Sequence, residues 1–184
     1  MQNWIAIGVA LAVVVYIIAA FNRLVSLRYR VRDAWAQIDV QLKRRHDLIP
    51  NLVSAVKGYM DHEREVLEGV TRARQQAMAA GGDVNSVAAA ETALTLATRK
   101  FMAVVEAYPA LRASENMLAL QEELSSTENR IAFARQFYND SVMEYNTARS
   151  TFPRNLVAAP FGFRPADMFA LEDAGARAAP QVKI

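Results

Sequence analysis

The chain has 184 residues, 53% of them hydrophobic, and its formal net charge at pH 7 is only +2. It contains no cysteine, which excludes disulfide bonds and cysteine-ligated zinc. Only seven glycines and six prolines interrupt it, and this scarcity of turn residues argues against a β-rich fold and favours an all-α class.

The first predicted element is an apolar segment from Trp4 to Phe21, in which no residue is charged. A helix of these eighteen residues, at about 1.5 Å per residue, covers most of a hydrocarbon core about 30 Å thick. Residues 1–22 are therefore predicted to form a transmembrane anchor. A cleaved signal peptide is the alternative, but the segment lacks the basic leading region of such peptides.

Basic residues gather directly after this segment. The membrane-proximal arginines are Arg23, Arg28, Arg30 and Arg32. The positive-inside bias places the C-terminal domain on the cytoplasmic side, with a periplasmic domain as the alternative. Because residues 23–45 carry a net charge of +5, which leaves −3 for the rest of the chain, anionic lipid is the expected partner and nucleic acid is not.

The next stretch, residues 22–50, has no glycine or proline before its last residue and continues the anchor as an amphipathic helix. Apolar residues recur in it at alternating steps of three and four, which defines one buried seam. The seam consists of Leu24, Leu27, Val31, Ala34, Ile38 and the polar Gln41, flanked by Trp35 and Leu42. This helix is predicted to run unbroken from the membrane to about Arg45.

Three further helices are predicted from the same periodicity. The second is expected to begin at the N-cap Asp47, with Pro50 harmless in its first turn, and to end near Ala79. The third and fourth are expected over residues 83–109 and 114–150. The predicted seam of the third helix is Val87, Ala90, Leu94, Ala97, Phe101 and Val104.

The connections between these helices are short, and their apolar spacing of about 3.5 residues is sustained. Residues 23–152 are therefore predicted to form an antiparallel bundle of four long helices, joined to the N-terminal transmembrane helix. In this topology the Gly81-Gly82 turn and Phe152 both lie at the membrane end of the bundle.

A segment with several aromatic residues and prolines follows, over residues 153–169. One interpretation is a cap folded onto the open end of the bundle. The other is an interaction or lipid-interface segment in which Phe152, Phe161 and Phe163 take part, since aromatic residues beside arginine suit the depth of lipid headgroups. Residues 170–184 are predicted to be a loose tail.

The sequence carries no recognisable catalytic or ligand-binding motif. Neither His46 nor His62 is preceded at i−3 by a carboxylate, as in the Glu-x-x-His pairs of di-iron bundles. Phosphate-binding loops and nucleophile motifs are also missing from the sequence. No catalytic residue, cofactor or metal is therefore predicted, and an enzyme is not expected.

A repeated polar pair stands out on the fourth helix. Tyr138-Asn139 and Tyr145-Asn146 are one heptad apart, which places two like pairs along one face. One interpretation is buried hydrogen bonding that fixes the helix register. The other is a recognition stripe for a partner helix.

Two long stretches resemble the LemA family. They are RVRDAWAQIDVQLKRRHDLIPNLVSAVKGYMDHE and EAYPALRASENMLALQEELSSTENRIAFARQFYNDSVMEYNTARSTFP. The resemblance covers about residues 20–165. It implies a bacterial single-pass protein of the inner membrane with a bundle of long helices, and a family without an assigned activity. Related chains include one linked to magnetosome membranes.

These observations together predict a membrane-anchored, non-enzymatic scaffold of the LemA type. It is expected to form homo-oligomers or to bind another membrane protein. The alternative is a homo-polymer that remodels or organises the membrane.

Overall fold

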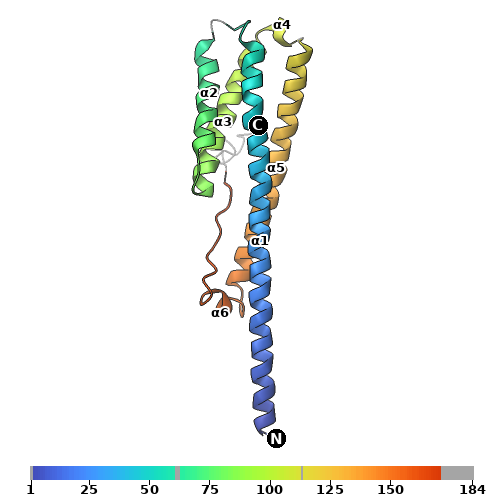
Figure 1. The fold of residues 1–184 in the computed structure, drawn as a ribbon, viewed down its shortest axis with the longest axis vertical. Helices are drawn as coiled ribbons and strands as arrows, with labels where there is room; N and C mark the ends of the chain where they lie inside the picture. The colour runs from blue at the N-terminus through green and yellow to red at the C-terminus, as the bar shows by residue number, and fades with distance from the viewer. Residues whose placement is uncertain (1, 61–62, 113, 171–184) are drawn as a thin grey trace, which may run out of the picture. The chain divides into compact units, whose positions relative to one another are not determined.

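The computed structural model describes residues 2–60, 63–112 and 114–170, and every regular element in this part of the chain is an α-helix (Figure 1). The elements in order are α1 (Gln2–Val56), α2 (Arg64–Ala79), α3 (Val84–Val105), α4 (Pro109–Arg112), α5 (Glu115–Ser150) and α6 (Asn155–Ala158). The predicted all-α fold class is confirmed.

The chain divides into two compact units. Unit 1 comprises residues 1–40 and 131–168, and unit 2 comprises residues 41–130 with the chain from 169 onward. Both long helices, α1 and α5, therefore contribute residues to each unit. The domain boundaries expected from the sequence, after residues 22, 152 and 169, remain predictions.

The N-terminal part of α1 combines two kinds of surface. Among the described residues, α1 is the helix long and apolar enough to cross a membrane. Its first apolar side chains are exposed, with Trp4 at 79% and Val15 at 65%, whereas Leu24 and Leu27 are buried at 0% and 2%. On one uninterrupted helix, residues suited to face lipid are thus followed by residues packed against protein.

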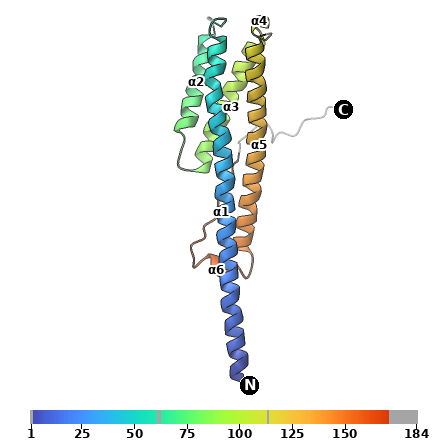
Figure 2. The same ribbon diagram turned by 45° about the vertical axis from the view of Figure 1, so that its right-hand side comes forward.

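Unit 1 is built on α1 and α5, which run antiparallel. Arg23 and Arg30 of α1 both contact Glu144 of α5, whereas Trp35, further along α1, stacks edge-on against Tyr138, which precedes Glu144. Figure 2 shows α6 and the C-terminal segment beside these two helices. The long helical segments of unit 1 are thus those of α1 and α5.

Unit 2 is the part of the fold with four long helical segments. The α2–α3 hairpin lies beside the C-terminal part of α1 and the N-terminal part of α5 (Figures 1 and 2). Asp83 caps the helix after the turn, because its Oδ1 accepts a hydrogen bond of 2.7 Å from the Ser86 backbone N–H. The core includes Leu52, Val56, Met60, Val70, Leu94, Phe101 and Leu124.

The predicted break between Arg45 and Asp47 is wrong, because α1 continues to Val56 with Pro50 inside it. Proline lacks a backbone N–H, so the carbonyl four residues earlier, that of His46, loses its helical donor. Arg74 of α2 replaces that donor: its Nε donates a 2.6 Å hydrogen bond to the His46 carbonyl. The chain instead reverses after Val56, before α2 begins at Arg64.

We expect Arg74→Met to destabilise this part of α1 by about 1–3 kcal/mol, because the partly buried His46 carbonyl is left without a donor. Native-state hydrogen exchange of the amides of residues 46–56 measures the change. Arg72→Met, an exposed arginine on the same helix, is the matched control and should change exchange little. Equal effects of the two substitutions would contradict this role for Arg74.

The expectation that the Gly81-Gly82 turn and Phe152 lie together at the membrane end of the bundle remains a prediction. Phe152 belongs to unit 1 and the turn to unit 2.

Candidate functional site

The last described part of unit 1, residues 153–168, is held on α5 by side chains that α5 aims at its backbone; we call this segment the strap. The Tyr145 hydroxyl donates to the Arg164 carbonyl, and the Tyr138 hydroxyl donates to the Asp167 carbonyl, both at 2.8 Å. Asn146 pairs with Ala166 twice, donating to its carbonyl at 2.8 Å and accepting from its N–H at 3.0 Å. The strap backbone is therefore tied to α5 at three points.

These bonds bear on the two interpretations of the repeated Tyr-Asn pairs, buried hydrogen bonding and a recognition stripe. Buried hydrogen bonding is confirmed for Tyr138 and Tyr145, which are 3% and 2% exposed, and Asn146 is half-buried. The structure shows their partner to be the C-terminal segment of the same chain, which the sequence interpretation had not foreseen. Asn139 is half-buried and also engaged.

The two tyrosines stay neutral donors at physiological pH. Burial raises the pKa of Tyr138 above its usual value of 10.0, and the neighbouring Asp167 raises it further. Burial also raises the pKa of Tyr145, an effect that Arg28 and Arg149 partly oppose. Ionisation, which would abolish each donor, is thereby disfavoured.

We expect Asn146→Ala to release the strap more often, because two hydrogen bonds worth about 1 kcal/mol each are lost. Chymotryptic cleavage after the buried Phe163 should then be about tenfold faster or more, as the opened population grows. Mass spectrometry of a digestion time course measures it. Asn129→Ala, an exposed asparagine of α5, is the control, and an unchanged cleavage rate in Asn146→Ala would contradict the strap contacts.

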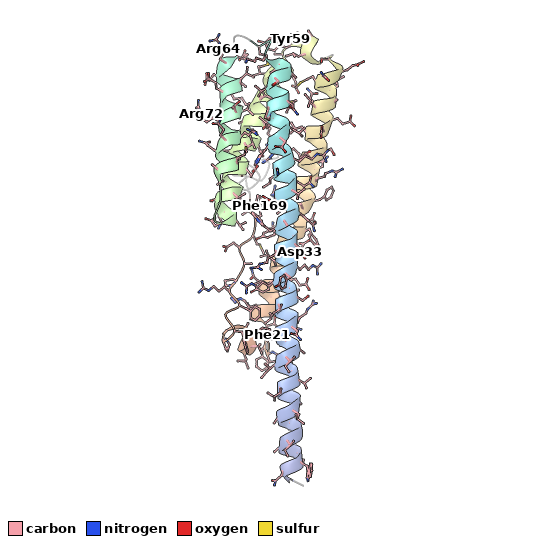
Figure 3. The ribbon with its side chains drawn as sticks, viewed as in Figure 1. Phe21, Asp33, Tyr59, Arg64, Arg72 and Phe169 are labelled. Atoms are coloured by element: carbon pink, nitrogen blue, oxygen red, sulfur yellow. The ribbon has the colours of Figure 1, made fainter. Side chains whose placement is uncertain are left out.

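An apolar layer lies under the strap. Its buried members are Leu24, Leu27, Tyr145, Ala148, Ala158 and Phe163. Phe21 meets two strap aromatics edge-on, with its ring centroid 5.1 Å from that of Phe161 and 5.6 Å from that of Phe163. Figure 3 shows Phe21 beside the α6 segment. The strap thus covers α1 at the point where its apolar N-terminal stretch ends.

The three phenylalanines expected at a lipid interface differ in exposure. Phe163 is a packing residue, only 7% exposed, whereas Phe161 is 57% exposed and Phe152 is 74% exposed. The cap interpretation therefore describes Phe163, and the surface interpretation describes Phe152 and Phe161. Contact of any of them with lipid stays a prediction.

The four membrane-proximal arginines also separate into two pairs. Arg23 and Arg30 both bind Glu144, at 2.7 and 2.8 Å, in half-exposed ion pairs that contribute little to stability. Arg28 and Arg32 line a cavity of about 410 Å³ together with Arg164 of the strap. The same two arginines line a second cavity of about 280 Å³, whose walls include Phe21 and Phe161.

Unit 2 contains a buried ionic cluster that the sequence interpretation missed. Arg45 is 2% exposed and pairs with the Glu91 carboxylate, and it donates 3.0 Å hydrogen bonds to Thr95 and Glu128. His46 Nε2 lies 2.7 Å from Glu91 Oε1. The sequence had placed Arg45 only at the expected end of the first helix. The one available signal was Glu91, the single acidic residue of the alanine-rich α3.

A groove of about 660 Å³ runs between the end of α1 and α2 in unit 2. Its apolar lining includes Val53, Met60 and Leu67, and its basic lining includes Arg64 and Arg72, which Figure 3 labels on α2. This combination of apolar and charged residues is typical of a surface that contacts another macromolecule.

No group of three or more metal-ligating side chains exists among the described residues. His46 is committed to Glu91, and His62 lies outside the described residues. The expected tail lies outside them as well, apart from Ala170. The interactions described above are hydrogen bonds, ion pairs and apolar packing, together with cavities lined by basic residues.

Comparison with known proteins adds evidence independent of the geometry. The LemA family model matches residues 34–184. The chain is 23% identical to Magnetosome protein MamQ 2 of Paramagnetospirillum magneticum, over 89% of this chain and 70% of that protein. It is 24% identical to Magnetosome protein MamQ of Magnetospirillum gryphiswaldense, over 90% and 73% respectively.

A further relative is Protein LemA of Metamycoplasma hominis, which is 26% identical over 74% of this chain and 63% of its own length. The family model covers well over half of the chain, including the second half of α1 and all of α2, α3 and α5. The resemblance seen in the sequence is therefore confirmed, and this chain belongs to the LemA family.

Proposed function

We propose that this LemA family protein is a membrane-anchored, non-enzymatic scaffold. It holds the helical part of the chain that follows Arg23, called the module below, at the surface of the bacterial inner membrane. The supporting observation is α1 itself. It passes without a break from exposed apolar residues such as Val15 to buried ones such as Leu24 and on to Val56. A continuous helix resists bending, so it keeps the module at a defined distance from the bilayer.

The module needs a surface with which to bind a second copy or another membrane protein. The groove of unit 2 supports this role, because it exposes apolar side chains next to positive charge and is not filled by the chain's own described residues. Ser54 is an exposed residue of its lining. An arginine at this position would add bulk and charge to the groove without touching the buried core.

Crosslinking of the full-length protein in native membranes, followed by native mass spectrometry in detergent, tests the scaffold function. We expect a homo-oligomer or one defined membrane-protein partner. Ser54→Arg should reduce that species, whereas Ser125→Arg, an exposed serine on α5, should not. Monomers alone, with no crosslinked membrane protein, would overturn the proposal.

The orientation of the module is part of the proposal. The arginines that follow the apolar segment favour a cytoplasmic position for everything after Arg23. Because the chain has no cysteine, Asp33→Cys introduces a single thiol at an exposed position. A membrane-impermeant thiol reagent should leave it unlabelled in intact spheroplasts and label it after lysis. Labelling before lysis would show a periplasmic module.

A second candidate function is membrane remodelling by a homo-polymer. The observation in its favour is Phe161, which is 57% exposed yet packs edge-on against Phe21 at the end of the apolar segment. Imaging of liposomes carrying the full chain should then show deformation that Phe161→Ser reduces. Phe133→Ser, at a 72% exposed phenylalanine of α5, is the control. Undeformed liposomes with the unaltered chain would remove this candidate.

A further inference from the structure

Three arginines of unit 1 converge on one cavity without a matching negative charge. Arg28 and Arg32 of α1 and Arg164 of the strap line a cavity of about 410 Å³, and none of its lining residues is acidic. Arg23 and Arg30 are different, because both bind Glu144. Within the part of the chain that the structure describes, no ion pair involves the three cavity arginines. Their positive charge is available to a ligand.

The cavity has the parts of a fixed anion site. Tyr145 lines it, and its hydroxyl is committed to the Arg164 carbonyl, which holds that strap residue in place. Gly162 also lines it, with a φ of 69°, a conformation that lets the strap turn beside α1 at low cost. Two guanidinium groups come from a rigid helix and the third from a segment tied down on both sides of Pro165. Arginine binds phosphate oxygens through two parallel N–H donors.

A second cavity beside the first adds an apolar surface. It measures about 280 Å³, shares Arg28 and Arg32 with the first, and is also lined by Phe21, Phe161 and Phe163. It too lacks an acidic lining residue. The two cavities, which share Arg28 and Arg32, therefore offer positive charge in one and aromatic rings beside it in the other. An amphiphile with an anionic head matches this order.

The position along α1 agrees with such a ligand. Arg28 lies seven residues after Phe21, about 10 Å along the axis. Helical side chains lean toward the N-terminus, so the Arg28 and Arg32 guanidinium groups approach the apolar boundary, as their shared cavity with Phe21 shows. The headgroup layer extends about 5–8 Å beyond each face of the hydrocarbon core. The arginines thus sit where phosphates are found if the membrane ends near Phe21.

We propose that these two cavities bind one anionic phospholipid, whose phosphate is held by Arg28, Arg32 and Arg164 and whose glycerol end contacts Phe21 and Phe161. This inference rests on the proposed membrane anchoring and makes it specific. The strap completes the site, since it supplies both Arg164 and Phe161. Bound lipid would in turn fasten the strap to α1.

Native mass spectrometry of the full chain, released from nanodiscs of phosphatidylglycerol and phosphatidylcholine in equal amounts, tests the site. We expect one phosphatidylglycerol retained in clear preference to phosphatidylcholine. Arg28→Gln/Arg164→Gln should reduce its retention at least tenfold, because charge-assisted contacts to the phosphate are lost. Arg23→Gln/Arg30→Gln removes the same charge outside the cavities and should keep the lipid bound.

Equal loss in the two double variants would overturn the proposal, since it would indicate diffuse attraction to basic residues. Retention without headgroup preference would overturn it as well. Competition by soluble glycerol phosphate at the lipid's own concentration would identify a free-anion site and contradict lipid binding. Arg164→Glu alone changes an exposed strap residue, so the folded structure should not be affected. This variant should also release the lipid while its thermal melt stays unchanged.

This test is separate from that of the scaffold function. If no lipid is retained while membrane association and the crosslinked species are intact, the proposed lipid site is contradicted and the scaffold function is not. If the crosslinked species are absent while lipid is still bound, the scaffold function is contradicted and the proposed lipid site is not.

Discussion

Glu91→Leu is expected to lower the unfolding free energy of unit 2 by about 3–5 kcal/mol, because it leaves the buried Arg45 without its principal counter-charge. Glu91 is 2% exposed and faces both Arg45 and His46, so water cannot replace the lost carboxylate. Glu128 remains beside Arg45, but it is partly exposed and satisfies one nitrogen only. Native-state hydrogen exchange of α3 in the full chain measures the change.

Two further variants isolate the cause of this effect. Glu123→Leu breaks the half-exposed pair with Arg44 and should cost less than about 1 kcal/mol. Arg45→Met/Glu91→Leu removes both buried charges and should recover most of the stability lost by Glu91→Leu alone. If Glu91→Leu costs no more than Glu123→Leu, the buried cluster does not stabilise unit 2.

Leu24→Ala is expected to cost about 2–5 kcal/mol in unit 1, the range for deleting a fully buried leucine side chain. Leu24 is 0% exposed and belongs to the apolar layer that contains Ala148 of α5 and Phe163 of the strap. Its loss leaves a cavity under the strap, so amides of residues 155–168 should exchange faster. Ser26→Ala, an exposed neighbour, is the control. Unchanged strap protection in Leu24→Ala would show that α1 does not hold the strap.

The sequence predicted the seam of α1 well. Leu24, Leu27, Ala34 and Ile38 are all buried, as the alternating spacing requires. Val31 and Trp35 are only half-buried. This success has a local cause, because the spacing of apolar residues on a helix fixes which face is buried. The family resemblance depended on the same stretch and on α5.

The end of α1 was mispredicted because its determinant is not local. Pro50 with Asp47 before it has the pattern of a helix start. The helix continues because Arg74, far along the chain, supplies the donor that the His46 carbonyl lacks. No periodicity or capping pattern around Pro50 contains that information.

The buried face of α3 was predicted correctly at Leu94 and Phe101 but one residue too early at the other positions, for a related reason. The predicted seam followed apolar residues through Val87, Ala90 and Ala97, whereas the buried positions are Ala88, Glu91, Leu94, Thr98, Phe101 and Val105. Two polar residues therefore occupy core positions, Glu91 because it pairs with Arg45 and Thr98 for no reason that the structure explains. A hydrophobic pattern cannot predict a buried ion pair, whose halves lie on different helices.

The candidate site was predicted in its parts and not in its assembly. The basic residues and the polar pairs of α5 were identified, but nothing in the sequence indicated that the strap joins them. An extended segment has no periodicity, and its bonds to Tyr145 and Asn146 use only backbone groups. Arg164 lines the same cavity as Arg28 and Arg32 because these bonds hold the strap on α5.

The central claim is that one unbroken helix leads from the bilayer to the packed protein. The cysteine-free chain allows spin labels to be placed only at Val15→Cys, in the apolar segment, and Asp33→Cys, in the solvated part of α1. Pulsed dipolar spectroscopy in nanodiscs should give a narrow distance distribution centred at about 27 Å, the length of five helical turns. A broad distribution, or one centred well below that distance, would show a break near the membrane surface and contradict the account.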